Sequence, residues 1–396
     1  MTRPLHLAVA LDGAGWHPAA WRLPSARPTE LLTARYWVDL VRRAEQGLLD
    51  FVTIEDALAL QSSSRSGPDG RVDEVRGRLD AVLVAARVAP LTARIGVVPT
   101  ATVTHTEPFH VSKAIATLDY VSGGRAGWRV QVSARPDEAA HVGRRTVPAV
   151  QPGADDPETQ RLLTELFDEA GDAVEVVRRL WDSWEDDAEI RDVATGRFVD
   201  RDKLHYIDFE GRWFDVRGPS ITPRPPQGQP VVVALAHAPV PRAFAARSAD
   251  VVLITPVDNA QGAAQVAEIG ALRQQAGREG ENHVFADLVV LLDVDEGRAQ
   301  ARWAQLDAWS GRPYTSDAEV FVGTPRGLAD LLLARADAGL AGFRLRPAAL
   351  PQDLDAIVDA LVPELQRRSA FRERYEASTL RGLLGLPRPT NRYATR

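Results

Sequence analysis

The side chains best able to do chemistry share one position in this sequence: each closely follows a short apolar run. Their carboxylates, hydroxyls and imidazoles can bind a cofactor or a substrate, and several can move protons. In chain order, these residues are His17, Asp56, Thr100, Thr102, His105, Ser133 and His237. They include no general-base dyad, so they indicate a binding pocket more than acid–base catalysis by the protein itself.

Each of these residues also has a structural interpretation. A carboxylate such as Asp56 after a strand often caps the next helix, and threonines at strand ends reflect β propensity. His237 ends an apolar run, where a histidine either contacts a ligand or is satisfied within the core. His105 and His110 are five residues apart and could share a metal ion, but no carboxylate pattern accompanies them. A metal-dependent barrel hydrolase rests only on such scattered histidines, and no metal site is predicted.

Eight apolar runs alternate with segments of helical periodicity, which is typical of a parallel sheet buried on both faces. Eight such units favour an α/β fold of the TIM (β/α)8 barrel type over an open doubly wound sheet. The runs that we expect to be strands are 5–11, 51–54, 95–98, 125–133, 231–235, 251–254, 285–291 and 343–345. Between the first three of these runs we expect one helix over 30–46, capped by Thr29, and another over 74–88. Active sites of such barrels lie at the carboxyl ends of the strands, where the polar residues above stand.

The rest of the chain is predicted to elaborate this barrel. A barrel takes about 250 residues, so a chain of 396 residues leaves room for insertions. We expect a single domain over 1–396, with insertions near 185–229 and 293–321 and a C-terminal tail at 369–396. The aromatic-rich stretch 197–225 is either a lid that excludes water or a structural cover.

Composition and missing motifs exclude several classes of protein. The formal net charge is −7 and the pI is near 5.7, which does not favour binding to nucleic acid or to an anionic membrane. The absence of cysteine excludes disulfides, thiolate metal sites and cysteine nucleophiles. No Gly-x-Gly-x-x-Gly follows the first run, and neither a P-loop nor a serine nucleophile elbow occurs. Since no apolar run could span a membrane and no signal peptide is recognisable, we expect a cytoplasmic protein.

Several longer sequence blocks are weak when taken singly and specific as an ordered set. They are R-x-E-x-G-x-x-D-F at 43–51, T-A-T-V-T-H-T-E-P-F-H-V at 100–111, A-T-L-D-Y-V-S-G-G-R at 116–125, L-W-D-S-W at 180–184, G-P-S-I-T-P-R-P-P-Q-G-Q-P-V at 218–231 and T-L-R-G-L-L-G-L-P-R-P-T-N-R at 379–392. This set resembles the bacterial luciferase-like flavin-dependent monooxygenases, in the branch of the nitrilotriacetate and dibenzothiophene-sulfone monooxygenases.

The resemblance implies a TIM barrel that uses reduced FMN, supplied by a separate flavin reductase, together with O2. The substrate would be a small, largely apolar organic molecule, and a homodimer is compatible with the resemblance. Asp56, Thr100 and Thr102 match family residues beside the flavin ring, and Ser133 matches the serine that ends the fourth strand. The cofactor would perform the difficult chemistry, while the protein provides a dry, shaped pocket. Our candidates for catalytic contacts are His17, His105 and His237.

The side of the site that would hold the flavin phosphate departs from the family pattern. Leu163 and Phe167 stand where the family has a histidine and a tyrosine. The family's Gly-Ser-Ser-x-x-Gly turn is replaced by Ala-His-Ala-Pro-Val-Pro at 236–241, in which two prolines remove backbone N–H donors. Arg129 replaces an asparagine of the family pattern.

Two interpretations follow from this departure. Flavin still binds if His237 and an arginine (Arg129, Arg144 or Arg145) replace the lost donors, because a guanidinium suits a phosphate. Alternatively, the chain uses deazaflavin F420, or is a flavin-free, non-catalytic binding protein for small molecules on the same barrel.

Overall fold

Eight parallel strands close into a ring in the computed structural model, which describes residues 4–62, 69–149, 156–278, 280 and 282–394. The ring closes because β1 pairs with both β2 and β13 while β10 pairs with both β9 and β11. In ring order the strands are β1 (His6–Leu11), β2 (Phe51–Ile54), β3 (Gly96–Thr102), β4 (Gly127–Gln131), β9 (Val231–Leu235), β10 (Val251–Ile254), β11 (His283–Leu292) and β13 (Gly342–Pro347). The predicted TIM barrel is confirmed, and the open doubly wound sheet is excluded.

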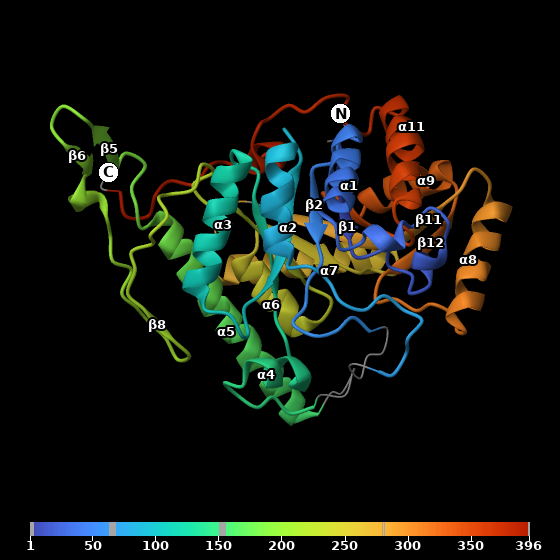
Figure 1. Cartoon of the computed structure of the whole chain (residues 1–396), viewed down its shortest axis with the longest axis horizontal. Coiled ribbons are helices and arrows are strands. Elements are labelled where there is room, and N and C mark those ends of the chain that lie inside the picture. Colours follow the sequence, from blue (N-terminus) through green and yellow to red (C-terminus); the bar gives the residue numbers. More distant parts are fainter. Residues whose placement is uncertain (1–3, 63–68, 150–155, 279, 281, 395–396) are drawn as a thin grey trace.

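Helices surround this ring, and several of them cover its near side in Figure 1. The apolar strands are buried on both faces: Ala8 faces the barrel interior, whereas Leu7 and Val9 pack under the helices. The surrounding helices are α1 (Ala34–Gln46), α2 (Ala81–Val88), α3 (Pro108–Ser122), α5 (Pro157–Asp182), α6 (Pro239–Ser248), α7 (Asn259–Gln275), α9 (Pro325–Ala336), and α10 (Gln352–Ala356), which continues through a π-helical turn (Ile357–Leu361) into α11 (Val362–Arg367).

Two helices begin later than their apolar periodicity predicts. The helix expected from Glu30 begins at Ala34, because Thr33 rather than Thr29 is the residue whose side chain caps the first turn. The helix expected from Glu74 begins at Ala81 and is capped by Asp80. In both cases the cap residue stands well inside the periodic stretch, so periodicity alone places the start too early.

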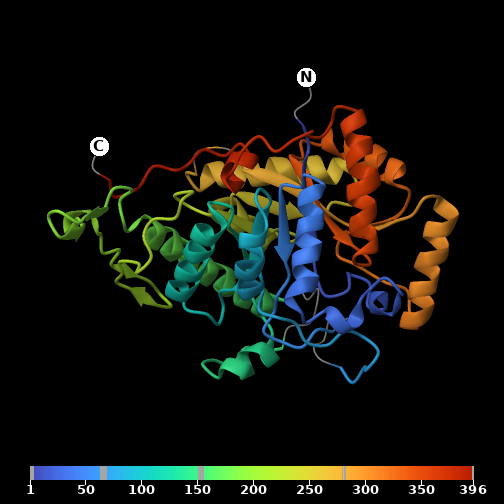
Figure 2. The ribbon, with the colours of Figure 1, turned by 45° about the horizontal axis from the view of Figure 1, so that its top comes forward.

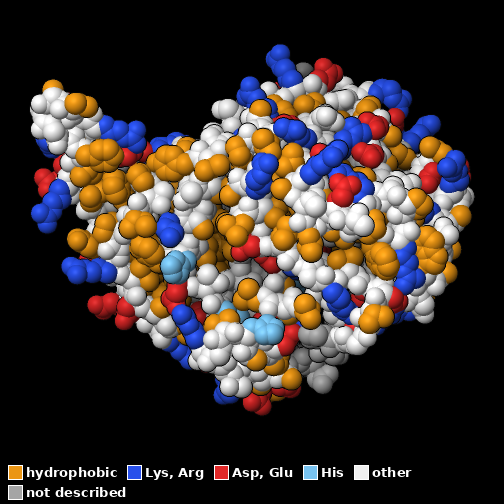
Figure 3. Space-filling model, in the orientation of Figure 1, with side chains coloured by type: hydrophobic (Ala, Val, Ile, Leu, Met, Phe, Trp, Pro, Cys, Tyr) orange, Lys and Arg blue, Asp and Glu red, His pale blue; other side chains and the backbone are white. Residues whose placement is uncertain are grey.

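The first predicted insertion, 185–229, contains two short antiparallel hairpins that project from the barrel (Figures 1 and 2). One hairpin pairs β5 (Glu189–Asp192) with β6 (Arg197–Val199), and the other pairs β7 (Phe209–Glu210) with β8 (Asp215–Val216). Hydrophobic side chains gather on the visible face of this arm (Figure 3). Phe198 is 63% exposed there.

The second predicted insertion, 293–321, is largely helical. It contains α8 (Glu296–Ser310), and its end leads into β12 (Glu319–Gly323). β12 pairs in parallel with the second half of β11, beyond the point at which β10 ends. The polar stretch after β4 likewise contains a short helix, α4 (Pro136–Val142).

The predicted C-terminal tail closes the base of the barrel. α12 (Leu380–Leu383) places Leu380 among interior side chains that include Phe51 and Val98. Gly96 leaves room for this contact, because a Cβ at that position would come within 2.6 Å of Leu380. Apolar side chains therefore pack across the barrel interior at the amino ends of these strands.

Among the described residues, no helix has both the length and the apolarity that a membrane crossing requires.

Candidate active site at the carboxyl end of the barrel

A network of buried charges fills the barrel interior near the carboxyl ends of the strands. Arg129 of β4 donates hydrogen bonds to Glu55 at 2.6 Å and to Thr100 at 2.7 Å. Arg344 of β13 donates to the other oxygen of Glu55 at 3.0 Å and to Thr53 at 3.1 Å. Burial by itself raises the pKa of Glu55, but the two arginines outweigh burial, and the pKa lies below its ordinary value. Glu55 is therefore ionised and joins the two guanidinium groups.

Asp287 of β11 forms the other centre of this network. Arg344 donates two hydrogen bonds to its carboxylate, at 2.8 and 2.6 Å, and Arg346 donates to the same carboxylate. Burial raises the pKa of Asp287, but Arg344 and Arg346 lower it to about 2. Arg346 also bonds Asp317 at 2.7 Å and lies 4.6 Å from the ring centroid of Trp16. The network thus fixes a rigid floor beneath the mouth of the barrel.

Sequence reasoning missed Asp287, Arg344 and Arg346. The alternation Phe-Arg-Leu-Arg in the last strand was an available signal, because residues two apart share one face of a strand. Two arginines on an inward face require buried carboxylates opposite them.

Three predicted cofactor-binding residues line one cavity of about 290 Å³ at the carboxyl ends of β2 and β3. Asp56 accepts hydrogen bonds from the backbone N–H groups of Ala57 and Ala81, so it also caps the start of α2. Burial raises the pKa of Asp56, and these backbone donors oppose the rise. Thr102 is buried, and within the described part of the chain its hydroxyl has no hydrogen-bond partner. Thr100 reaches the same cavity, although its hydroxyl accepts from Arg129.

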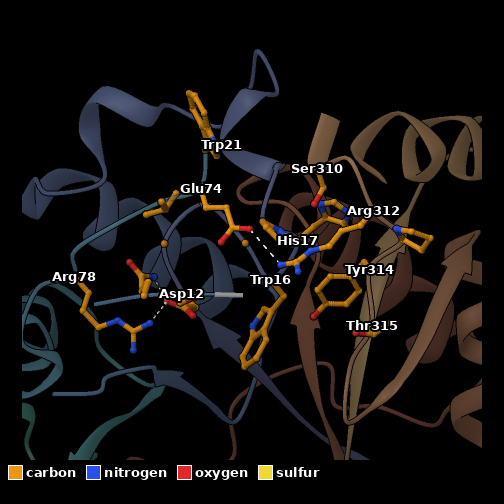
Figure 4. A pocket seen from close by; sticks show the side chains of 18 residues that line it. Asp12, Trp16, His17, Trp21, Glu74, Arg78, Ser310, Arg312, Tyr314 and Thr315 are labelled. Atoms are coloured by element: carbon orange, nitrogen blue, oxygen red, sulfur yellow. Dashed lines mark hydrogen bonds and ion pairs between the residues drawn. The ribbon is translucent and has the colours of Figure 1, made fainter. Parts of the chain in front are cut away.

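His17 lies in a different cavity, of about 580 Å³, at the carboxyl end of β1 (Figure 4). Its side chain is buried and held at both nitrogens: Nδ1 accepts from the backbone of Ala19 at 3.2 Å, and Nε2 lies 3.1 Å from Asp307. This arrangement requires the proton on Nε2, which donates to the carboxylate. Burial lowers the pKa of His17 more than Asp307 raises it, so the imidazole is neutral. Its ring packs against Trp303 and Tyr314.

His105 and Ser133 follow β3 and β4, as predicted, but line neither of these cavities. The Nε2 atom of His105 is buried and has no hydrogen-bond partner among the described residues. Burial, with a smaller effect from Arg145, lowers the pKa of His105. The hydroxyl of Ser133 accepts a hydrogen bond from the backbone N–H of Arg135 at 3.3 Å, and the backbone N–H of Ser133 donates to the Thr104 hydroxyl at 2.8 Å.

The turn predicted to face a phosphate offers few donors. His237 is exposed at the end of β9, so it is not the core histidine that the apolar run allowed. Pro239 and Pro241 leave one backbone N–H among the first three residues of α6. Phe167 packs on Phe244 of α6, with ring centroids 5.6 Å apart.

The three arginines considered for phosphate binding all have carboxylate partners. Arg129 is held in the barrel interior by Glu55. Arg144 pairs with Glu107, and Arg145 pairs with Glu169 at 2.6 Å. Binding a phosphate would therefore require any of them to exchange an existing partner.

The described residues contain no group of three or more His, Cys, Asp or Glu side chains placed to hold a metal ion.

Comparison with known proteins places this barrel in a family. The sequence profile described as luciferase-like monooxygenase matches residues 16–342. N-acetyl-S-(2-succino)cysteine monooxygenase of Bacillus subtilis is 30% identical, over 99% of both chains. Nitrilotriacetate monooxygenase component A of Aminobacter aminovorans is 31% identical, over 99% of this chain and 98% of that protein. The chain belongs to the luciferase-like monooxygenase family. It is an oxidoreductase of the flavin-dependent monooxygenase class.

Solved structures agree in fold. A long-chain alkane monooxygenase superposes with a TM-score of 0.85 at 24% identity, covering 97% of this chain and 96% of the other. EDTA monooxygenase of Chelativorans sp. BNC1 superposes with a TM-score of 0.82 at 24% identity, covering 98% of this chain and 99% of the other.

The residues present fit the ring of a flavin better than its phosphate. A cavity with mainly apolar walls, the carboxylate of Asp56 and the unpartnered hydroxyl of Thr102 suits a planar heteroaromatic ring. On the phosphate side, the candidate arginines are paired and the α6 turn has lost donors.

Proposed function

We propose that the chain is the oxygenase component of a two-component monooxygenase that uses reduced FMN and O2 to oxygenate a small organic substrate. Membership of the family supports flavin as the cofactor. The name of one relative, component A, supports a second component, which would be a flavin reductase. When bound, reduced flavin would supply the two electrons that reduce O2, so that one oxygen atom enters the substrate and the other leaves as water.

The observation that carries this proposal is the cavity shared by Asp56, Thr100 and Thr102. Asp56 and Thr102 are the residues that would hold the flavin ring. Asp56 is oriented by two backbone N–H groups, and the Thr102 hydroxyl is available to a ligand. The buried network around Glu55 keeps the Thr100 side chain in place. These residues orient and shield a ring, and no proton transfer by the protein is needed at this cavity.

His237 is the remaining candidate near a flavin phosphate. Because it is exposed and follows β9, it can adjust its position without disturbing packed side chains. A homodimer, which the resemblance allows, remains a prediction.

The names of the relatives do not determine which substrate this chain would use. The substrates in their names range from long-chain alkanes and dimethyl sulfide to nitrilotriacetate and dibenzothiophene sulfone. The chemistry of the substrate must therefore be argued from the cavities of this chain.

The test is a titration of the purified protein with oxidised and reduced FMN, followed by calorimetry, with deazaflavin F420 tested beside it. We expect the reduced form to bind with a micromolar dissociation constant, which corresponds to a binding free energy of about −8 kcal/mol. Binding of F420 in preference to FMN would make F420 the cofactor in place of FMN, and binding of neither would favour a flavin-free protein.

A further inference from the structure

The cavity of about 580 Å³ beside β1 has the size and place of a ligand site (Figure 4). Its walls come from parts of the chain that are distant in sequence: 12–21 after β1, 61–62 and 74–78 before α2, and 310–315 from the end of α8 onward. It opens at the carboxyl end of the barrel, the end at which barrels of this type bind their ligands.

Unpartnered polar atoms are concentrated in this cavity. In the described part of the chain, ten buried side-chain polar atoms have no hydrogen-bond partner. Three of the ten belong to side chains that line this one cavity: Trp16 Nε1, Gln61 Oε1 and Arg78 Nε. Buried polar groups in folded proteins are nearly always paired, so three orphans at one cavity indicate a missing polar ligand.

The three side chains are held by other contacts. Gln61 donates to Asp12 at 3.0 Å through Nε2, which turns Oε1 away from that carboxylate. Arg78 lies 3.5 Å from Asp12 through Nη2, which leaves Nε uncommitted. The ring of Trp16 stacks on Arg346. Because these contacts fix the side chains, the unpartnered atoms form a preorganised set of two donors and one acceptor.

The donors and the acceptor define the ligand. The N–H groups of Arg78 and Trp16 both need an acceptor, and a guanidinium is the strongest partner for a carboxylate. Gln61 Oε1 needs an N–H or O–H donor. The two carboxylates that line the cavity, Asp12 and Glu74, both have arginine partners, so neither invites a cationic ligand.

We propose that this cavity binds the substrate, and that the substrate is a small organic carboxylate that also carries an N–H or O–H group. Its role as the substrate site rests on the proposed monooxygenase function. The side chains of Trp21 and Tyr314 line the same cavity and would pack on the apolar part of the molecule. The proposal differs from the largely apolar substrate that the sequence resemblance implies.

The experiment compares three probes on the full-length protein by calorimetry, without flavin and again with FMN present. N-acetylmethionine has a carboxylate and an amide N–H, its methyl ester lacks the charge, and methyl propyl sulfide retains only the thioether. We expect the acid to bind at least about tenfold more tightly than the ester, and the sulfide most weakly. Equal binding of acid and ester, tighter binding of the sulfide, or no binding of any probe would overturn the proposal.

Two variants assign the selectivity to the orphaned atoms. Trp16→Phe removes the indole N–H and keeps an aromatic ring, and it should weaken binding of the acid about three- to tenfold. Arg78→Met should abolish the preference for acid over ester, whereas Arg35→Met, at an 82% exposed side chain, is the matched control and should retain it. If Arg78→Met keeps the preference, the guanidinium is not the recognition group.

Flavin titrations of the same proteins separate this proposal from the proposed function. Loss of FMN binding with retained acid selectivity would contradict the monooxygenase function alone. FMN binding without acid selectivity would contradict the substrate class alone.

Discussion

Arg344 and Asp287 are register partners on neighbouring strands β13 and β11, and two hydrogen bonds of 2.8 and 2.6 Å join them inside the barrel. Both side chains are almost fully buried. Two parallel N–H···O bonds fix the orientation of both groups, and Arg344 extends the same constraint to Glu55. This pair is the structural centre of the floor beneath the candidate site.

Removal of one partner of this pair should be strongly destabilising. Arg344→Met leaves Asp287 as a buried charge with fewer donors, and we expect a loss of about 3–5 kcal/mol in the free energy of unfolding. Urea denaturation followed by fluorescence measures it. The exposed Arg35→Met serves as the control and should change stability by less than about 0.5 kcal/mol. An equally small effect at Arg344 would show that the network does not stabilise the barrel.

The same pair predicts how stability depends on pH. The pKa of Asp287 is held at about 2 in the folded protein, below its ordinary value of 3.8. A depressed carboxyl pKa stabilises the fold above the unfolded value, and that stability is lost as the pH falls from about 4 to about 2. We expect this group to contribute about 2 kcal/mol of the loss. Denaturation curves measured at several pH values across this range give the free energy of unfolding as a function of pH. This free energy should depend less on pH in Asp287→Asn than in the wild-type protein, and an unchanged pH dependence would contradict the assignment.

His17 should act on stability through its neutral form. Its two nitrogens bond Ala19 and Asp307, so His17→Gln should lower stability by about 1–2 kcal/mol. Because burial lowers the pKa of His17, protonation of the unfolded chain below its ordinary value of 6.5 should destabilise the wild-type protein. NMR titration of the imidazole checks the shift. A pKa above 6.5 would refute the neutral assignment.

His237→Ala tests the remaining candidate for the phosphate side. As an exposed residue it should contribute less than about 0.5 kcal/mol to stability. If His237 contacts the phosphate, the variant should bind FMN about three- to tenfold more weakly. Its affinity for riboflavin, which lacks the phosphate, should be unchanged. Equal losses for both flavins would place His237 near the ring, and no loss would remove it from the site.

Thr102→Val tests the ring side of the proposed cofactor site. The substitution keeps the shape of a buried side chain and removes its unpartnered hydroxyl. We expect reduced FMN and riboflavin to lose affinity together, about three- to tenfold. Thr117→Val, which removes a helix-surface hydroxyl bonded to Lys113 O, is the matched control. Unchanged affinity for both flavins would move the ring out of this cavity.

Local patterns in the sequence predicted the barrel well. Each apolar run became a ring strand, and Asp56, Thr100 and Thr102 stand at the carboxyl ends of two strands, β2 and β3, that proved to be neighbours. The beginnings of α1 and α2 were wrong by several residues, because one cap side chain, Thr33 or Asp80, decides where a helix starts.

The sequence alone determined the alternation of strands and helices, the family and the set of polar residues at strand ends, because these depend on neighbours along the chain. Only the tertiary structure decided which distant groups meet. Asp287 and Arg344 are 57 residues apart, and His17 and Asp307 are 290 apart. Closure of the barrel and the register of its strands determine such contacts. For the same reason the structure alone revealed the buried floor of charges and the orphaned atoms around Arg78.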